Sequence, residues 1–421
     1  MPNDTKKPND PTSTAKDKAP RNLVSDILGV GRLAVDGTVG VTALVEAMHH
    51  TITQIPLPWG EPLKGKATGL TGFVYQSIRD IAQVVGIGMD GLLQSLGPWL
   101  ELQSTSEHHE ALVAVLNGVV GDHLEATQNP LALPMRFRHA GVPLDLTPEA
   151  LRQAYPETCG KLLILVHGLC MNDLLWTRNG HNHGLALAQE LRMCPIFLHY
   201  NSGLHTSVNG EHLSALLETL VLQWPEQIEE IVILGYSMGG LVTRSAYEAA
   251  RLAGHTWPQY LKRWVFLGTP HHGSPLERGG NHIDWFLEKS PYAAPFSRLG
   301  KLRSAGVTDL RHGNLLREDW EGQDRFETSE DLRRPVPLPV GVESFALAGV
   351  LGQDEAHLAA KHFGDGLVPV ESALGKHPDP SKTLAFPSDH QWVGQGIHHL
   401  DLLDRLDVYE QIRQWLASSP S

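Results

Sequence analysis

From about residue 131 onward, short apolar runs alternate with stretches of helical periodicity. The run at 161–166 is continuous, as expected for a strand that is buried on both faces. Strands are predicted at 135–138, 161–166, 195–200, 230–235, 264–267, 343–348 and 383–386, and helices at 184–191, 211–223, 238–253 and 402–416. This alternation over about 290 residues predicts an α/β fold with a mainly parallel, doubly wound sheet.

A tight turn between one predicted strand and the next helix carries the strongest chemical signal. The motif at 235–239 reads Gly-Tyr-Ser-Met-Gly and follows the apolar run at 231–234. A Gly-x-Ser-x-Gly motif between a strand and a helix is typical of a nucleophile elbow. In so tight a turn, side chains two residues either side of the serine would collide, and Gly235 and Gly239 remove them. Ser237 is therefore predicted to be a nucleophile, the alternative being an ordinary serine in a glycine-rich turn.

A second turn could complete an oxyanion hole, which needs two backbone N–H groups directed at the developing negative charge. The residue after the nucleophile, Met238, supplies the first donor. The predicted strand at 161–166 ends in His167, Gly168 and Leu169. Because Gly168 lets the backbone approach closely, the N–H of Leu169 is the expected second donor. An ordinary turn between a strand and a helix is the alternative.

A nucleophilic serine also needs a base, which follows it in the chain in this class of fold. His399 stands just before the last predicted helix and is the preferred candidate. His398 and His390 are the alternatives.

The acid that orients the base should lie between the serine and the histidine. Asp365 is preferred because Gly364 and Gly366 flank it, so a tight loop could hold its carboxylate against the imidazole. The alternatives are Asp354 and, less favoured, Asp309 and Glu343.

These motifs together resemble α/β hydrolases of the lipase and esterase type, most closely the group of bacterial lipases and GPI inositol-deacylase-like hydrolases. The resemblance rests on the stretches 166–169, 235–240, 268–274, 364–369 and 399–403. It implies a catalytic triad of Ser237, Asp365 and His399, with the same two oxyanion donors. Tyr236 is a departure, because many relatives carry histidine there, but the difference is not expected to abolish the chemistry.

The stretch from 272 to 340 interrupts the alternation and is too long for an ordinary connection. It is predicted to be an inserted cap or lid over the carboxyl edge of the sheet. Its aromatic residues Trp285, Phe286, Tyr292 and Phe296 favour a substrate with a lipophilic acyl or alcohol part.

The region before the predicted catalytic domain (131–421) divides into two parts. Residues 1–20 combine prolines with charges and are predicted to be a disordered tail. Residues 21–130 are predicted to be helical, with apolar runs at 23–55, 70–102 and 107–126. We expect a helical hairpin or small bundle that packs on the catalytic domain. Peripheral membrane contact through an amphipathic face within 22–128 is the alternative.

Composition narrows the partners and the compartment. Lys and Arg number 34 against 47 Asp and Glu, so the formal charge is 34 − 47 = −13, which disfavours a nucleic-acid partner. The three cysteines, Cys159, Cys170 and Cys194, give no disulfide framework and fit a reducing compartment. Because the sequence shows no signal peptide and no run of 18 apolar residues, a cytoplasmic location is expected.

The 23 histidines raise the question of a metal. His181 and His183 have His-x-His spacing, and His271 and His272 form another pair, but no His-Glu-x-x-His motif occurs. Packing and hydrogen bonding are the expected roles of most histidines. Some relatives hold a structural calcium near the catalytic histidine, where Asp401 matches, but calcium needs about six to eight oxygen ligands. No metal and no cofactor are predicted.

The predicted function is hydrolysis of carboxylic, lipophilic esters through a Ser-His-Asp triad and an acyl-enzyme. An acyltransferase with the same triad is one alternative. A lipid-binding or partner-binding protein that acts through the N-terminal helices is another. The sequence makes no prediction of oligomeric state.

Overall fold

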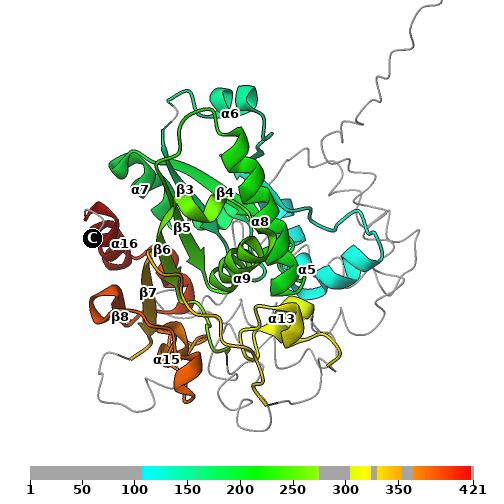
Figure 1. Cartoon of the computed structure of the whole chain (residues 1–421), viewed down its shortest axis with the longest axis vertical. Coiled ribbons are helices and arrows are strands. Elements are labelled where there is room, and N and C mark those ends of the chain that lie inside the picture. Colours follow the sequence, from blue (N-terminus) through cyan, green and yellow to red (C-terminus); the bar gives the residue numbers. More distant parts are fainter. Residues whose placement is uncertain (1–106, 158, 275–303, 324–329, 353–363, 419–421) are drawn as a thin grey trace, which may run out of the picture.

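The computed structural model describes residues 107–157, 159–274, 304–323, 330–352 and 364–418 (Figure 1). The predicted tail at 1–20, the helical runs at 23–55 and 70–102, and the aromatic part of the insert lie outside the described residues.

The described residues form a sheet with the strand order β2-β1-β4-β3-β5-β6-β7-β8. Strand β1 pairs in antiparallel fashion with β2 and β4, and the pairs from β4 to β8 are parallel. The mainly parallel sheet predicted from the sequence is therefore confirmed. The strands are β1 (Arg136–His139), β2 (Val142–Pro143), β3 (Lys161–Val166), β4 (Cys194–His199), β5 (Glu230–Tyr236), β6 (Leu261–Leu267), β7 (Glu343–Val350) and β8 (Gln391–Gln395).

Helices cover both faces of the sheet (Figure 1). Helices α6, α8 and α9 pack on one face, and α7 and α16 pack on the other. The α-helices are α5 (Glu107–Ala126), α6 (Pro148–Ala154), α7 (His183–Leu191), α8 (Thr206–Gln223), α9 (Met238–Ala253), α13 (Ala305–Asp309), α15 (Val370–Ala373) and α16 (Leu406–Ala417). The short 3₁₀ helices are η1 (Asp173–Trp176), η2 (Trp257–Tyr260), η3 (Arg317–Asp319), η4 (Pro380–Lys382), η5 (Ser388–His390) and η6 (His399–Leu403).

Strand β5 shows why the central strands are continuous apolar runs. Ile231 and Ile233 belong to the core on the α8 and α9 side, whereas Val232 and Leu234 belong to the core on the α7 and α16 side. All four side chains are fully buried. Because successive side chains of a strand point to opposite faces, a strand covered on both faces must be apolar at every position.

Most predicted elements are confirmed to within a few residues, and α5, α9 and β3 have the predicted bounds. The strand predicted at 383–386 is wrong. Leu384 and Phe386 are buried, but the Leu384 N–H donates to the carbonyl of Gly375 in a turn and not to a neighbouring strand. The predicted last helix also begins too early, because the turn η6 precedes α16. Among the described helices, none is both long and apolar enough to span a membrane.

Candidate active site

Ser237 occupies a strained turn between β5 and α9. Its backbone has φ 53° and ψ −126°, a combination that non-glycine residues rarely adopt. The N–H of Ser237 donates to the carbonyl of Leu267 at 2.8 Å, and the N–H of Gly240 donates to the carbonyl of Ser237 at 3.0 Å. Ser237 is half-buried, although Tyr236 and Met238 on either side are buried. The turn therefore presents the serine at the carboxyl edge of the sheet.

The two glycines of the motif make this turn possible. A Cβ on Gly235 would lie 2.8 Å from the Cα of Gly240. A Cβ on Gly239 would collide with the carbonyl oxygen of Val166 and lie 2.6 Å from that of His167. Since these neighbours are backbone atoms, they cannot move aside as a flexible side chain would. Helix α9 can begin here only because both side chains are absent.

The turn after β3 lies directly beside the turn that holds Ser237. Val166 and Gly235 are paired in the parallel register of β3 and β5, so both chains leave the sheet at the same level. A Cβ on Gly168 would lie 3.0 Å from the Cβ of Ser237. The segments that carry the predicted oxyanion donors, Leu169 and Met238, are therefore adjacent.

His167 anchors this turn as a neutral side chain. Its ring stacks on Tyr200 with centroids 4.4 Å apart, and the Tyr200 hydroxyl donates to the His167 carbonyl at 2.8 Å. Burial lowers the pKa of His167 to about 3, because charge is costly away from water. His167 is thus uncharged at neutral pH and helps to fix the loop.

Asp365 and His399, distant in sequence, lie in direct contact, and both are buried. The Nδ1 of His399 is 2.7 Å from the Oδ2 of Asp365. The Oδ1 atom accepts from the N–H groups of Leu367 and Val368 at 3.0 and 2.9 Å. The backbone N–H of His399 donates to the Asp365 carbonyl at 3.0 Å. The carboxylate is therefore fixed at both oxygens and orients the imidazole through one ring nitrogen.

The loop around Asp365 depends on both flanking glycines. Gly364 has φ 55° and Gly366 has φ 97°, which glycine adopts without the strain of a side chain. A Cβ on Gly364 would collide with the carbonyl oxygen of Val368. This tight loop brings the carboxylate against the His399 ring.

Two further residues shape the surroundings of His399, and the sequence analysis missed both. The Tyr236 hydroxyl donates to the His399 carbonyl at 3.1 Å, and the two rings lie 5.0 Å apart. A Cβ on Gly268, which has φ 56°, would lie 3.1 Å from Cε1 of His399 and 3.2 Å from Oδ2 of Asp365. The available signals were the place of Tyr236 beside the serine and the Gly-Thr-Pro stretch after β6.

The alternative bases lie in different surroundings. His398 is exposed, and its backbone N–H donates to Oδ2 of Asp401 at 3.0 Å. The Nδ1 of His390 is 3.1 Å from the Ser344 carbonyl. His399 is the candidate that the structure brings to Asp365.

Two of the alternative acids pair with other residues. The Nδ1 of His205 is 3.1 Å from the carboxylate of Asp309, and Arg263 lies 3.1 Å from that of Glu343. Asp354 lies outside the described residues.

The predicted His-x-His pair packs beneath the turn that carries His399. The Nε2 of His181 is 2.7 Å from the Nδ1 of His183, whose own Nε2 is 3.1 Å from the carbonyl of Leu402 in η6. Burial lowers the pKa of His183 to about 4. Within the ranges that the structure describes, no group of three or more His, Cys, Asp and Glu residues could hold a metal ion.

Arg178 pairs with the acidic side chains around Asp401, the residue that matches the calcium site of some relatives. Arg178 Nη2 lies 3.7 Å from a carboxylate oxygen of Asp401, and Arg178 Nε lies 3.3 Å from one of Asp404. These ion pairs join the loop before α7 to the turn that carries His399.

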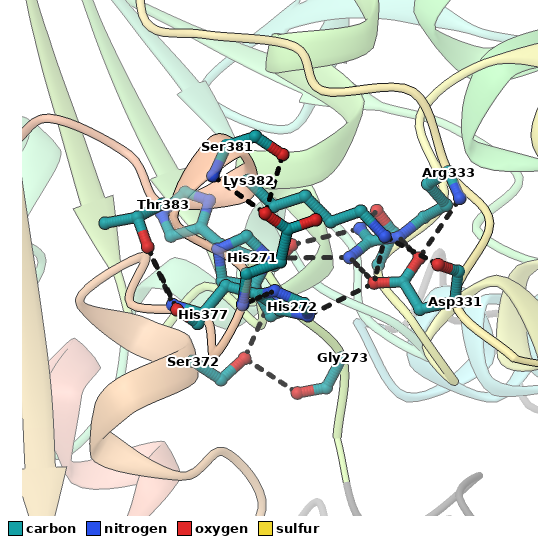
Figure 2. A network of polar contacts seen from close by, with 12 residues as sticks. His271, His272, Gly273, Asp331, Arg333, Ser372, His377, Ser381, Lys382 and Thr383 are labelled. Carbon is teal, nitrogen blue, oxygen red and sulfur yellow. Dashed lines mark hydrogen bonds and ion pairs between the residues drawn. The ribbon is translucent and has the colours of Figure 1, made fainter.

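The histidine pair after β6 belongs to a polar network (Figure 2). Arg333 donates to the His271 carbonyl at 3.2 Å and forms two bonds of 2.9 Å with Asp331, whose carboxylate lies 3.4 Å from Lys382. Burial and the nearby arginines lower the pKa of His272 to about 3 and that of His271 well below its usual value. Two neutral histidines thus help to fix the end of the insert beside the turn after β6.

The strand order and the strained serine turn are those of an α/β-hydrolase fold, as the resemblance drawn from the sequence predicts. A family model described as the PGAP1-like alpha/beta domain matches residues 205–333. That segment contains Ser237 but neither Asp365 nor His399.

Solved structures with a similar course of the chain include several lipases. The mature lipase BlEst2 of Bacillus licheniformis is 18% identical over 61% of this chain and 92% of its own, with a TM-score of 0.39. Lipase B of Aspergillus fumigatus is 11% identical over 94% of this chain and 85% of its own, with a TM-score of 0.42. The phospholipase PlaB of Legionella pneumophila is 16% identical over 51% of this chain and 44% of its own, with a TM-score of 0.33. No curated protein matches the sequence.

Proposed function

We propose that this protein is a serine hydrolase that cleaves carboxylic esters. The observation that carries the proposal is the buried Asp365–His399 pair, with 2.7 Å between its bonded atoms, in a fold whose strained serine turn presents Ser237. Tyr236, which adjoins the serine, also contacts His399, so the acid–base pair and the serine turn are physically connected.

The reaction would follow the order of the triad. Asp365 binds Nδ1 of His399, which leaves Nε2 to take the proton from Ser237 as its oxygen attacks the ester carbonyl. The N–H groups of Leu169 and Met238 would stabilise the oxyanion, and the alcohol would leave with the proton from the imidazole. A water activated by the same histidine would then hydrolyse the acyl-enzyme.

A lipophilic ester is the proposed substrate class. This part of the proposal rests on the aromatic residues of the insert, which lie outside the described residues. Turnover of a series of p-nitrophenyl esters should rise from acetate toward longer acyl chains. Product analysis with a competing alcohol would distinguish hydrolysis from acyl transfer, since transfer would yield a new ester.

Covalent labelling tests the nucleophile directly. A fluorophosphonate should label the wild-type protein, and Ser237→Ala should lose both labelling and ester turnover. Ser214→Ala is a matched control, because Ser214 Oγ is 2.8 Å from Nδ1 of His255 but lies within helix α8 instead of a strained turn. Labelling that persists in Ser237→Ala would exclude Ser237 as the nucleophile.

A further inference from the structure

Helix α5 packs against the loops that follow β3 and β4, at the carboxyl edge of the sheet where the candidate site lies. It lies beside α13 (Figure 1). It also contacts η1, the turn that follows the predicted oxyanion loop. Glu110 near its start pairs with Arg138 of β1, and Asn117 is fully buried. The Asn117 amide donates to the Leu131 carbonyl at 2.8 Å and accepts from Leu133 N–H at 2.9 Å. Polar contacts therefore fix this helix along much of its length.

Two glycines on α5 allow its backbone to touch neighbouring loops. A Cβ on Gly118 would collide with the Cys170 sulfur and lie 2.7 Å from the Cys170 Cα. A Cβ on Gly121 would collide with Oδ1 of Asn201 and lie 2.8 Å from Cγ of the same side chain. A methyl group at Gly118 would meet backbone atoms, and one at Gly121 would displace the Asn201 amide from its hydrogen bonds to the Gly121 carbonyl and the Gly203 N–H.

The loops contacted by these glycines hold the backbone next to the predicted donor Leu169. Cys170 follows Leu169 directly, has φ 58°, and donates its N–H to Ser202 Oγ at 3.0 Å. Asn201, the neighbour of Ser202, donates its side-chain amide to the Gly121 carbonyl at 2.9 Å. The Leu169–Cys170 backbone is thus held between α5 and the loop after β4.

The other predicted donor is connected to α5 through α13. Ser304 Oγ donates to the Gly118 carbonyl at 2.7 Å, and Ala305 N–H donates to the Asp122 carboxylate at 3.0 Å. A Cβ on the next residue, Gly306, would lie 3.1 Å from Cε of Met238. Helix α5 therefore supports the surroundings of both donors, although it precedes the predicted catalytic domain in the sequence.

We propose that α5 is a positioning element of the oxyanion hole, in which Gly118 and Gly121 set the place of the Leu169 N–H through Cys170 and Asn201. The inference rests on the proposed ester hydrolysis. An added methyl group would push the Leu169–Cys170 backbone away from its place, so the transition state would lose stabilisation while the bound ester would lose little.

The test measures kcat, KM and inhibition by a trifluoromethyl ketone, whose bound form carries an oxyanion, in Gly118→Ala and Gly121→Ala. We expect kcat to fall by about 10- to 100-fold, less than the ~10²–10³ of a lost donor, with KM changed less than about twofold. The inhibition constant should rise in parallel with the loss in kcat. Glu125→Ala, at an exposed position of the same helix, should match the wild type.

Hydrogen exchange of the peptide that covers 167–173 provides a readout that does not depend on activity. Faster exchange is expected in both glycine variants and in Asn201→Ala, which removes the hydrogen bond from the loop after β4 to the Gly121 carbonyl of α5 and decides the question if a glycine variant fails to fold. Unchanged kcat and unchanged exchange in the folded variants would overturn the inference. If the wild-type protein hydrolyses no ester, the proposed function fails, and exchange alone still shows whether α5 holds the loop.

Discussion

The two halves of the candidate active site are built in different ways. Around β3 and β5, the close approach of the two turns depends on glycine, because a side chain at Gly168, Gly235 or Gly239 would collide with its neighbours. Around β7 and β8, it depends on side-chain groups, with Asp365 bound to His399. Activity should therefore be lost in the first half when a methyl group is added to a glycine. In the second half, activity should be lost when a hydrogen-bond acceptor is replaced by a donor.

The largest effect is expected in the side-chain half, for Asp365→Asn. The variant can keep an oxygen for the N–H groups of Leu367 and Val368, but its amide would face Nδ1 of His399 as a donor. The imidazole would then carry its proton on the wrong nitrogen, and kcat should fall by about 10³–10⁴-fold. Steady-state kinetics with a p-nitrophenyl ester measures this loss.

Asp309→Asn is the matched control, because Asp309 is another buried Asp in contact with a histidine. Asp309 accepts from Thr206 N–H at the start of α8 and lies beside His205, so its loss should affect stability more than kcat. Equal losses of kcat in both variants at equal stability would contradict the distinction between the two pairs.

The backbone half should respond to Gly239→Ala. The new methyl group would collide with the carbonyl oxygens of Val166 and His167. Overpacking of this kind lowers the free energy of unfolding by about 1–3 kcal/mol. Displacement of the Met238 N–H should lower kcat by up to about 10²–10³-fold. Urea unfolding and steady-state kinetics measure the two effects.

Gly254→Ala, at the other end of α9, controls for the general cost of replacing glycine. Its φ of 68° strains a side chain, but no atom lies within 4 Å of the added Cβ. We expect a loss of stability of about 1–2 kcal/mol with kcat unchanged. A kcat as low as that of Gly239→Ala would show that helix stability, and not contact at the turn, governs activity.

The parts that could be predicted are those whose cause is local. A strand covered on both faces must be apolar throughout, and a turn too tight for side chains requires glycine, so β3, β5 and the serine turn were identified from the sequence. Asp365 was likewise preferred because of its flanking glycines.

The parts that were missed depend on contacts between distant segments. Gly118 touches Cys170 only after folding, and no local periodicity marks that contact. Strand β8 lies at the edge of the sheet, with half-exposed side chains at Gln391, Trp392 and Val393, so it lacks the continuous apolar run. The segment 383–386 buries Leu384 and Phe386, but it makes a turn instead of a strand.

A pH effect on stability should come from the buried histidine under η6. The pKa of His183 is lowered to about 4 by burial, against about 6.5 in the unfolded chain. Between these values the unfolded state binds more protons, so the free energy of unfolding should fall as the pH is lowered, by up to about 1.4 kcal/mol per pH unit from this group.

His183→Gln should flatten this pH dependence, because glutamine can still donate to the Leu402 carbonyl but does not titrate. The remaining slope would come from other groups, including His167 and His272, whose pKa values are both lowered to about 3. Urea unfolding at several pH values between 4 and 7 measures the slope.

The smallest effect is expected where the two halves meet, at Tyr236. Phenylalanine would keep the ring against His399 but remove the hydroxyl that donates to its carbonyl at 3.1 Å. Loss of one buried hydrogen bond costs about 1–3 kcal/mol, and kcat should fall by about tenfold or less because Asp365 still orients the imidazole. If Tyr236→Phe lowered kcat as much as Asp365→Asn, the imidazole would be held mainly through its backbone, and the contrast between the halves would fail. Steady-state kinetics of both variants under one set of conditions decides between these outcomes.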